Sequence, residues 1–268
     1  MEYRRLGRTR ERVSVIGMGA WGMGLLRNSE AWTRELRSLR RGMELGVTLI
    51  DTAETYSSGR SEELVGEAVK GHREEVLIAT KVAPPHLDHD AVIKACNRSL
   101  RRLGTTYIDL YQVHWPDPSV SIKETMSAME KLVQEGKVRY IGVSNFGVAE
   151  TTDARAALGR NEITSNQVEY SLTNRYVEPE ILPYCSREGI TLIAYSPLAN
   201  GRITTSVQES LLGRYKMTPA QIMLNWVTRN ECVVAIPKAS DVAHMEENAA
   251  SVSARFDPKD YELLSSSL

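Results

Sequence analysis

The chain has 268 residues, of which 42% are hydrophobic and 25% are charged, as in an ordinary globular protein. Its 33 lysine and arginine side chains are balanced by 34 acidic ones, a net charge of −1, which disfavours a nucleic-acid partner because phosphate binding needs excess cations. The nearly uncharged stretch Val13–Leu26 is shorter than the roughly 20 apolar residues of a membrane span, and the first residues lack the apolar core of a signal peptide.

Short apolar runs alternate with longer amphipathic runs along the chain. Val13–Ile16 predicts the first strand, since β-branched residues suit a pleated surface. Ser29 predicts the N-cap of a helix that ends near Leu45, where Gly46 can adopt the left-handed conformation. Further strands are expected at Val47–Ile50, Val76–Thr80, Tyr107–Val113, Val138–Val143, Ile163–Val168, Ile190–Ala194 and Val233–Ile236. The helices after them are expected at Ser61–Lys70, Asp90–Leu103, Ile122–Glu135, Val148–Leu158 and Glu178–Arg187, from Thr218 onward, and at Val242–Val252.

This alternation gives eight strands, each followed by a helix. Strands joined by crossover helices lie parallel, and continuous apolar runs are typical of strands buried on both faces. We therefore predict an α/β fold of the (β/α)8 TIM-barrel type, with an open doubly wound sheet as the alternative that periodicity leaves open. Tyr3–Leu6 and the residues before Val13 predict a short N-terminal β-hairpin around Gly7 that caps the N-terminal end of the barrel. No linker or low-complexity stretch divides the sequence, so residues 1–268 are expected to form a single domain.

Three cysteines lie far apart in the sequence, at Cys96, Cys185 and Cys232. Without a CxxC pair or a histidine at ligand spacing, they disfavour structural zinc and a disulfide framework. We expect a cytoplasmic protein without a metal site.

The sequence Gly17-Met-Gly-Ala-Trp-Gly22 matches the GxGxxG fingerprint of dinucleotide-binding turns. Residues 23–28 separate it from the helix cap at Ser29, so no helix N-terminus is directed at the motif. Asp51 lies 29 residues after the last glycine, beyond the spacing of about 20 for the acidic residue of that fingerprint. We therefore interpret the motif as a glycine-rich turn at the mouth of a barrel strand.

Polar side chains stand at the ends of seven predicted strands. These residues are Asp51, Lys81, His114, the pair Ser144 and Asn145, Gln167, Tyr195 and Lys238. In a barrel they would share the face where the loops build active sites.

Asp51, Tyr56, Lys81 and His114 together suit the transfer of a proton to a carbonyl oxygen. An ammonium next to a phenol favours the phenolate and lowers the pKa of the phenol, while a carboxylate would hold the lysine in place. Tyr56 would act as the general acid, and a neutral His114 imidazole would orient the carbonyl. No cysteine ends a strand and Ser144 has no histidine nearby in sequence, which disfavours nucleophilic catalysis. A structural ion pair is the alternative interpretation of Asp51 and Lys81.

Several sequence motifs follow one another in order. Leu49-Ile-Asp-Thr-Ala-Glu-Thr-Tyr-Ser-Ser-Gly-Arg-Ser-Glu-Glu-Leu-Val-Gly66 contains Asp51 and Tyr56, and the next two, Ala79-Thr-Lys-Val82 and Gln112-Val-His-Trp-Pro116, contain Lys81 and His114. They are followed by Ile141–Phe146, Asn166–Tyr170, Ala194–Leu198 and Thr218–Gln221. Over about residues 3–256 the chain resembles the aldo-keto reductases. The resemblance implies a barrel that binds a nicotinamide cofactor without a Rossmann domain, with Asp51, Tyr56, Lys81 and His114 as its catalytic residues.

The resemblance also implies that the cofactor is NADPH or NADP, with NADH as a weaker one. Ser144, Asn145 and Gln167 would bind the carboxamide, and Tyr195 would stack on the nicotinamide ring and fix the face that offers its hydride. Lys238 would pair with the 2′-phosphate. The other expected cofactor contacts are Gly19, Ala20, Trp21, Asp51, Ser196, Pro197, Leu198, Ile236, Ser240, His244, Glu247 and Asn248.

Two positions depart from the family pattern near that phosphate. The family usually has a serine where this chain has Ala239 and an arginine where it has His244. An arginine is always charged and can make two parallel bonds to a phosphate, whereas a histidine is mostly neutral at pH 7. We therefore predict that NADPH is preferred over NADH by a smaller margin than the family usually shows.

The expected substrate pocket is lined by Trp21, Tyr56, His114 and Trp115. The segment of 20 residues between Pro197 and Thr218 and the stretch after Phe256 are short for this family, which predicts an open pocket for small molecules.

The predicted function is NADPH-dependent reduction of small aldehydes or ketones to alcohols, short sugars or hydroxyaldehydes among them. The alternative is an NADP-binding regulatory or redox-sensing subunit with slow turnover, for which a complete catalytic set would be unnecessary. The oligomeric state and the natural substrate stay open.

Overall fold

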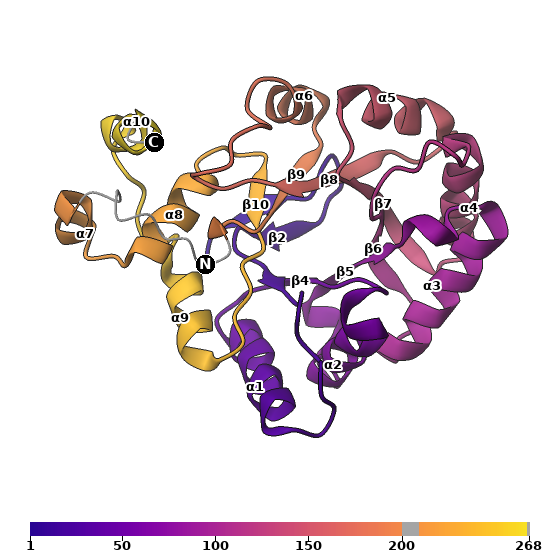
Figure 1. Ribbon diagram of the computed structural model, residues 1–268, viewed down its shortest axis with the longest axis horizontal. Coiled ribbons are helices and arrows are strands. Elements are labelled where there is room, and N and C mark those ends of the chain that lie inside the picture. The colour runs from indigo at the N-terminus through magenta and orange to yellow at the C-terminus, as the bar shows by residue number, and fades with distance from the viewer. Residues whose placement is uncertain (200–208, 267–268) are drawn as a thin grey trace.

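The computed structural model describes residues 1–199 and 209–266, and it confirms the predicted barrel. Within these residues, eight parallel strands pair in chain order in one curled sheet (Figure 1). The ring closes where Ile16 pairs with Ala235 and the amide of Gly17 donates to the Ala235 carbonyl at 2.7 Å, which excludes the open doubly wound sheet. The strands are β3 (Met18–Gly19), β4 (Leu49–Asp51), β5 (Leu77–Val82), β6 (Ile108–Val113), β7 (Val138–Ser144), β8 (Ile163–Glu169), β9 (Thr191–Tyr195) and β10 (Val233–Ala235).

A helix follows each strand and packs on the outside of the sheet (Figure 1). The predicted helices are α1 (Glu30–Glu44), α2 (Arg60–Ala68), α3 (His89–Leu103), α4 (Ile122–Gln134), α5 (Val148–Ala157), α6 (Ile181–Glu188), α8 (Pro219–Val227) and α9 (Val242–Ala250). Ser29 caps α1 by accepting from the Trp32 amide at 3.1 Å, and Gly46 has a φ of +82°, as the sequence predicts. No helix within the described residues is long and apolar enough to cross a membrane.

Two further helices, α7 (Glu209–Tyr215) and α10 (Pro258–Ser266), are not predicted by the sequence analysis. Figure 1 shows both on the outer side of α8. Asp260 of α10 accepts hydrogen bonds from Arg214 and Tyr215 of α7, and Tyr261 donates to Asn225 of α8 at 2.7 Å. These polar contacts attach α10 to the barrel together with the buried Leu264, and polar contacts give no hydrophobic periodicity that a sequence pattern would reveal.

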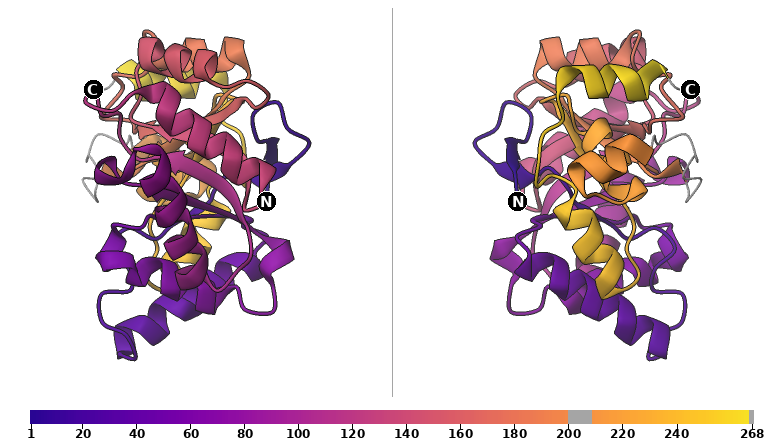
Figure 2. Two further views of the ribbon diagram at one scale, coloured as in Figure 1. Left: turned by 90° about the vertical axis from the view of Figure 1, so that its right-hand side faces the viewer. Right: turned by 90° about the vertical axis from the view of Figure 1, so that its left-hand side faces the viewer.

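The N-terminal hairpin is confirmed, but the predicted first barrel strand is only partly right, because just its last residue, Ile16, pairs with Ala235 of the barrel. Strands β1 (Tyr3–Arg5) and β2 (Arg12–Ser14) form the antiparallel hairpin, so half of Val13–Ile16 belongs to β2 (Figure 2). The first barrel strand is β3, further along the chain. Val13 belongs to the hairpin, yet it is buried against the barrel interior, where it packs with Leu6. The β-branched run misled the prediction because this hairpin residue is as buried as a residue of a barrel strand.

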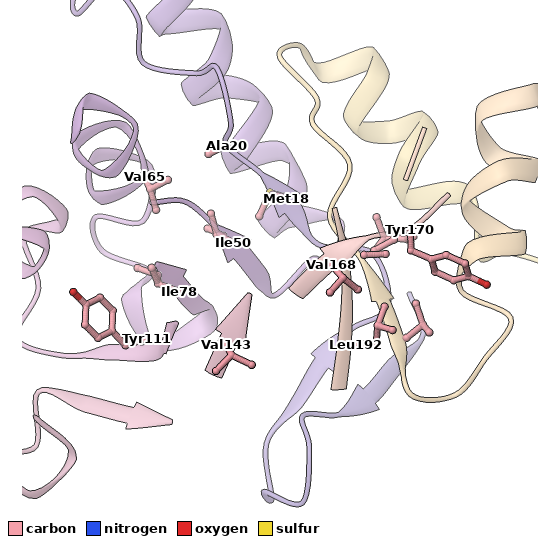
Figure 3. Packing of buried hydrophobic residues seen from close by; sticks show 14 of the residues in the cluster. Met18, Ala20, Ile50, Val65, Ile78, Tyr111, Val143, Val168, Tyr170 and Leu192 are labelled. Atoms are coloured by element: carbon pink, nitrogen blue, oxygen red, sulfur yellow. The ribbon is translucent and has the colours of Figure 1, made fainter. Parts of the chain in front are cut away.

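In several strands the residues alternate between two hydrophobic cores. In β4 and β5, Ile50 and Ile78 face the helices and belong to the large outer core (Figure 3). Leu49, Leu77 and Ala79 face inward and belong to a small core inside the barrel. This period of two is the geometry of a strand, and it decides which polar residues enter the barrel interior.

The glycine-rich motif is required by barrel closure. A Cβ atom at Gly19 would lie 2.5 Å from the carbonyl oxygen of Ile236, because β3 approaches the chain after β10 closely. Gly22 has a φ of +72°, as a turn at the mouth of the strand requires. The interpretation of the motif as a barrel-strand turn is therefore confirmed.

We predict that Gly19→Ala lowers the free energy of unfolding by about 1–3 kcal/mol, because the added methyl group collides with backbone. Urea denaturation would measure the change. Gly213→Ala is the matched control, since a Cβ there meets nothing within 4 Å in helix α7. Equal stability of Gly19→Ala and the wild type would contradict this explanation of the motif.

Candidate active site

The alternation of strand residues brings polar groups together inside the C-terminal end of the barrel. Leu49 and Ala79 point inward, so Asp51 and Lys81, each two residues further along its strand, also point inward. β4 and β5 are neighbours in the sheet. The two opposite charges therefore meet inside the barrel.

Asp51 and Lys81 form a buried ion pair. Lys81 Nζ donates to Asp51 Oδ1 at 2.7 Å and to the Thr52 carbonyl at 2.9 Å, and the Lys81 side chain is 0% exposed. The second carboxylate oxygen accepts from Gln167 Nε2 at 2.7 Å. Burial disfavours the ammonium and is the largest single effect, but the Asp51 carboxylate and the Tyr56 hydroxyl together outweigh it, and the pKa of Lys81 is raised above its ordinary value. The lysine is thus held charged below the cavity.

Tyr56 lies above this pair at the start of the short helix η1 (Tyr56–Gly59). Lys81 Nζ is 3.3 Å from Tyr56 Oη. The sequence predicts a phenol whose pKa is lowered by the ammonium. In the structure, burial outweighs the ammonium and leaves the pKa of Tyr56 above its ordinary value. Tyr56 is therefore protonated at neutral pH, as a proton donor must be.

His114 stands directly after β6 and faces the ring of Tyr56. Their ring centroids are 5.8 Å apart in an edge-to-face arrangement at 74°. Burial and the charge of Lys81 lower the pKa of His114 to about 3. The structure therefore gives the neutral imidazole that the sequence analysis expects.

Asn145 connects three strands at the same end of the barrel. Its Nδ2 donates to the carbonyl of His114 at 3.0 Å, and its Oδ1 accepts from Tyr195 Oη at 3.0 Å. Its backbone has a φ of +62°, a left-handed conformation that asparagine tolerates better than most residues. Ser144 Oγ donates to the Gln167 carbonyl at 2.9 Å. These bonds fix the ends of β6, β7, β8 and β9 relative to one another.

A cavity of about 1040 Å³ opens above these groups. It is lined by eighteen of the residues selected from the sequence: Gly19, Trp21, Asp51, Tyr56, His114, Trp115, Ser144, Asn145, Gln167, Tyr195, Ser196, Pro197, Leu198, Ile236, Lys238, His244, Glu247 and Asn248. Lys81 lies beneath the wall, behind Asp51 and Tyr56. Ala20 is fully buried, and neither it nor Ser240 belongs to the wall that the described residues form.

Other wall residues were not selected from the sequence. They are Gly22, Leu25, Thr55, Ser57, Glu169, Pro219, Ala220 and Pro237. Glu169 follows Gln167 by two residues on β8, so strand alternation alone would have found it. Pro219 and Ala220 begin α8, which strand ends cannot predict, but they lie in the motif Thr218–Gln221, so the family resemblance could have indicated them.

Comparison with known proteins assigns the chain to a family. The model of the Aldo/keto reductase family matches residues 15–268. This chain belongs to the aldo-keto reductases. It is 40% identical over 256 residues to methylglyoxal reductase YeaE of Escherichia coli, a match that covers 93% of this chain and 89% of that protein.

Solved structures agree with this assignment. The crystal structure of the thermostable aldo-keto reductase Tm1743 with the inhibitor epalrestat matches at a TM-score of 0.95 and 37% identity, covering 100% of both chains. An aldo-keto reductase of Klebsiella pneumoniae in complex with NADP and acetate matches at a TM-score of 0.89 and 38% identity, covering 98% of this chain and 93% of that one. As a member of this family, the chain is an NADP(H)-dependent oxidoreductase of carbonyl compounds.

We predict that His114 does not titrate between pH 5 and pH 8, because its pKa lies at about 3. NMR spectra of the imidazole signals across this range would measure it, with His114→Gln used to assign the His114 resonances. A midpoint near the ordinary histidine value of about 6.5 would contradict the burial argument.

Proposed function

We propose that this aldo-keto reductase reduces small aldehydes and ketones to alcohols with NADPH, and that Tyr56 is the general acid. One observation carries the proposal: the Tyr56 phenol lines the cavity directly above a buried Lys81–Asp51 pair, beside a neutral imidazole.

Each of these side chains has a separate task in the reaction. NADPH, when bound, supplies a hydride to the carbonyl carbon. Tyr56 Oη donates its proton to the carbonyl oxygen as that oxygen becomes an alkoxide. Lys81 stabilises the phenolate that remains, and Asp51 holds the ammonium in place. The neutral His114 can donate a hydrogen bond to the carbonyl oxygen and orient it beside Tyr56.

The residues of the cavity fit a nicotinamide dinucleotide phosphate. Polar side chains of Ser144, Asn145 and Gln167 line the end near Tyr56 and suit the carboxamide. Tyr195 lines the cavity, and its hydroxyl is bound by Asn145, so its ring is held in place for stacking. Lys238 and His244 also line the cavity and supply positively charged or hydrogen-bonding groups for a phosphate. Glu247 and Asn248 line it as well and suit the adenine.

The surroundings of the proposed 2′-phosphate site support a modest preference for NADPH. Ala239 is buried and has no hydroxyl group to donate. The Nδ1 atom of His244 is already paired with Asp241 at 2.8 Å, and that carboxylate would repel a phosphate. Lys238 is therefore the main group proposed to distinguish the two cofactors.

An open, partly aromatic pocket supports small carbonyl substrates. Trp21 and Trp115 line the cavity and are 65% and 48% exposed, so neither is enclosed by a covering loop within the described residues. The relative from Escherichia coli is named a methylglyoxal reductase, which is a reductase of a small 2-oxoaldehyde. We propose short aldehydes of this kind as the first substrates to test.

The regulatory alternative is not favoured, because the full set Asp51, Tyr56, Lys81 and His114 is assembled with a geometry suited to turnover. The cytoplasmic location stays a prediction from the missing signal-peptide core and the cysteine pattern, and the lack of a nucleic-acid partner stays a prediction from the balanced charge.

We predict that Tyr56→Phe lowers the rate of NADPH oxidation with methylglyoxal at least about 10²-fold, because the general acid is removed. NADPH absorbance would measure turnover, and fluorescence titration would check that NADPH still binds. The matched control is Tyr195→Phe, which loses another cavity phenol and should cost less than about tenfold, the worth of one neutral hydrogen bond. Comparable losses in both variants would contradict the role of Tyr56.

We predict that Lys238→Ala raises the Kd for NADPH about 10- to 100-fold, as expected for a lost charged hydrogen bond, and leaves the Kd for NADH unchanged. Fluorescence titration of both cofactors would measure the change. Lys137→Ala, at the N-terminal end of β7, is the control. Equal weakening of both cofactors would place Lys238 away from the 2′-phosphate.

A further inference from the structure

Glu54 lies two residues before Tyr56, and its side chain is only 5% exposed. The chemistry proposed above assigns it no task. A buried carboxylate is costly unless it is paired and hydrogen-bonded, so its partners indicate what it does. These partners all come from the segment that begins with the strand carrying Lys81.

The Glu54 carboxylate extends the pairing of β4 and β5 beyond the ends of the strands. The Thr52 amide donates to the Ala79 carbonyl at 2.9 Å, and the Glu54 amide approaches the Lys81 carbonyl at 3.4 Å. Glu54 Oε1 then accepts from the Ala83 amide at 2.8 Å. The segment after β4 that carries Tyr56, residues 52–59, is called the Tyr56 loop. The Glu54 side chain therefore continues the hydrogen bonding between β4 and β5 where the backbone of this loop no longer does so.

Two further groups surround this carboxylate. His86 Nδ1 lies 2.9 Å from Glu54 Oε1, and Arg98 Nη2 lies 3.5 Å from Glu54 Oε2. His86 belongs to the short helix η3 (Pro84–His86), and Arg98 belongs to α3. The loop after β4 is thereby attached to β5, η3 and α3 on one side. On its other side, Ser57 Oγ donates to the Met23 carbonyl at 2.6 Å.

The Tyr56 loop holds strained backbone that needs such attachments. Ser57 and Ser58, directly after Tyr56, have φ values of +50° and +56°, which cost energy for residues other than glycine. Thr55 makes no side-chain cap to this turn, although the Ser58 amide donates to the Thr55 carbonyl at 3.3 Å. Bonds from outside the short helix η1 therefore help to maintain the conformation that keeps Tyr56 Oη near Lys81 Nζ.

We propose that Glu54 is a positioning residue for proton transfer: its bond to the Ala83 amide fixes the Tyr56 loop to the end of β5 and keeps the Tyr56 hydroxyl within reach of Lys81 and the substrate. Val82 of the same strand end accepts from the His114 amide at 2.9 Å. One short segment, Lys81–Ala83, thus holds the ammonium, the imidazole and, through Glu54, the phenol. This inference rests on the proposed role of Tyr56.

The test compares Glu54→Ala and Glu54→Gln with the wild type in NADPH oxidation with methylglyoxal. Glu54→Ala removes the bond to Ala83, and a misplacement of about 1 Å costs on the order of 10²-fold, so kcat should fall about 10- to 100-fold. The Kd for NADPH should stay unchanged, and the solvent deuterium isotope effect on kcat should rise because proton donation becomes slower. Glu54→Gln keeps an oxygen that can accept from the Ala83 amide and should restore most of kcat.

Asp109→Asn is the matched control. Asp109 is another buried carboxylate on β5's neighbour β6, and it accepts from the Ile78 amide at 3.0 Å at the opposite end of β5. Its variant should lower the thermal midpoint without raising the solvent isotope effect. A rise in that effect in Asp109→Asn equal to that in Glu54→Ala would show general loosening of the barrel and overturn the inference.

Three other results would overturn it. If Glu54→Ala keeps the wild-type kcat while Tyr56→Phe is inactive, the positioning role of Glu54 is rejected and the role of Tyr56 as general acid is kept. A loss in Glu54→Ala that Glu54→Gln fails to restore would assign the effect to the charge and not to the bond with Ala83. Full activity of Tyr56→Phe would reject the proposed function, and this inference with it.

Discussion

The buried ion pair between Lys81 and Asp51 is the interaction on which the site depends. Two charges removed from water cost several kcal/mol each, and their attraction repays this only when the geometry is good and the remaining polar atoms are satisfied. Here Lys81 Nζ donates to Asp51 and to the Thr52 carbonyl, and Gln167 satisfies the second carboxylate oxygen. Such a pair is a poor way to stabilise a barrel. Its position under the Tyr56 phenol indicates instead a role in proton transfer.

The barrel supplies what this pair needs. Parallel strands deliver their carboxyl ends to one face, and strand alternation points Asp51 and Lys81 into the interior above the small core of Leu49 and Ala79. The same enclosure raises the pKa of Tyr56 and lowers that of His114 to about 3. Burial thus sets the protonation of both groups in the sense that carbonyl reduction requires, a protonated phenol and a neutral imidazole.

Much of this was predictable from the sequence. The runs from Val47 to Ile236 predict the strands from β4 to β10 because most of them are rich in apolar residues and have polar residues at their ends. Val13–Ile16 misled the analysis because a hairpin that covers the barrel end buries β-branched residues as a strand does. Helix α10 is held by one buried leucine, Leu264, and by polar bonds to α7 and α8, which leave little periodic signal. The pKa of Tyr56 was predicted with the wrong sign, since burial depth is invisible in a sequence.

The most direct test of the central claim is single-turnover reduction of methylglyoxal by NADPH bound to Lys81→Met. Removing one partner of a buried pair can destabilise a protein by about 3–5 kcal/mol, so Asp51→Asn/Lys81→Met, which leaves no unpaired charge, is measured beside it. We expect both variants to bind NADPH and the reduction step to slow at least about 10²-fold. Reduction at the wild-type rate in either folded variant would show that the ion pair is only structural.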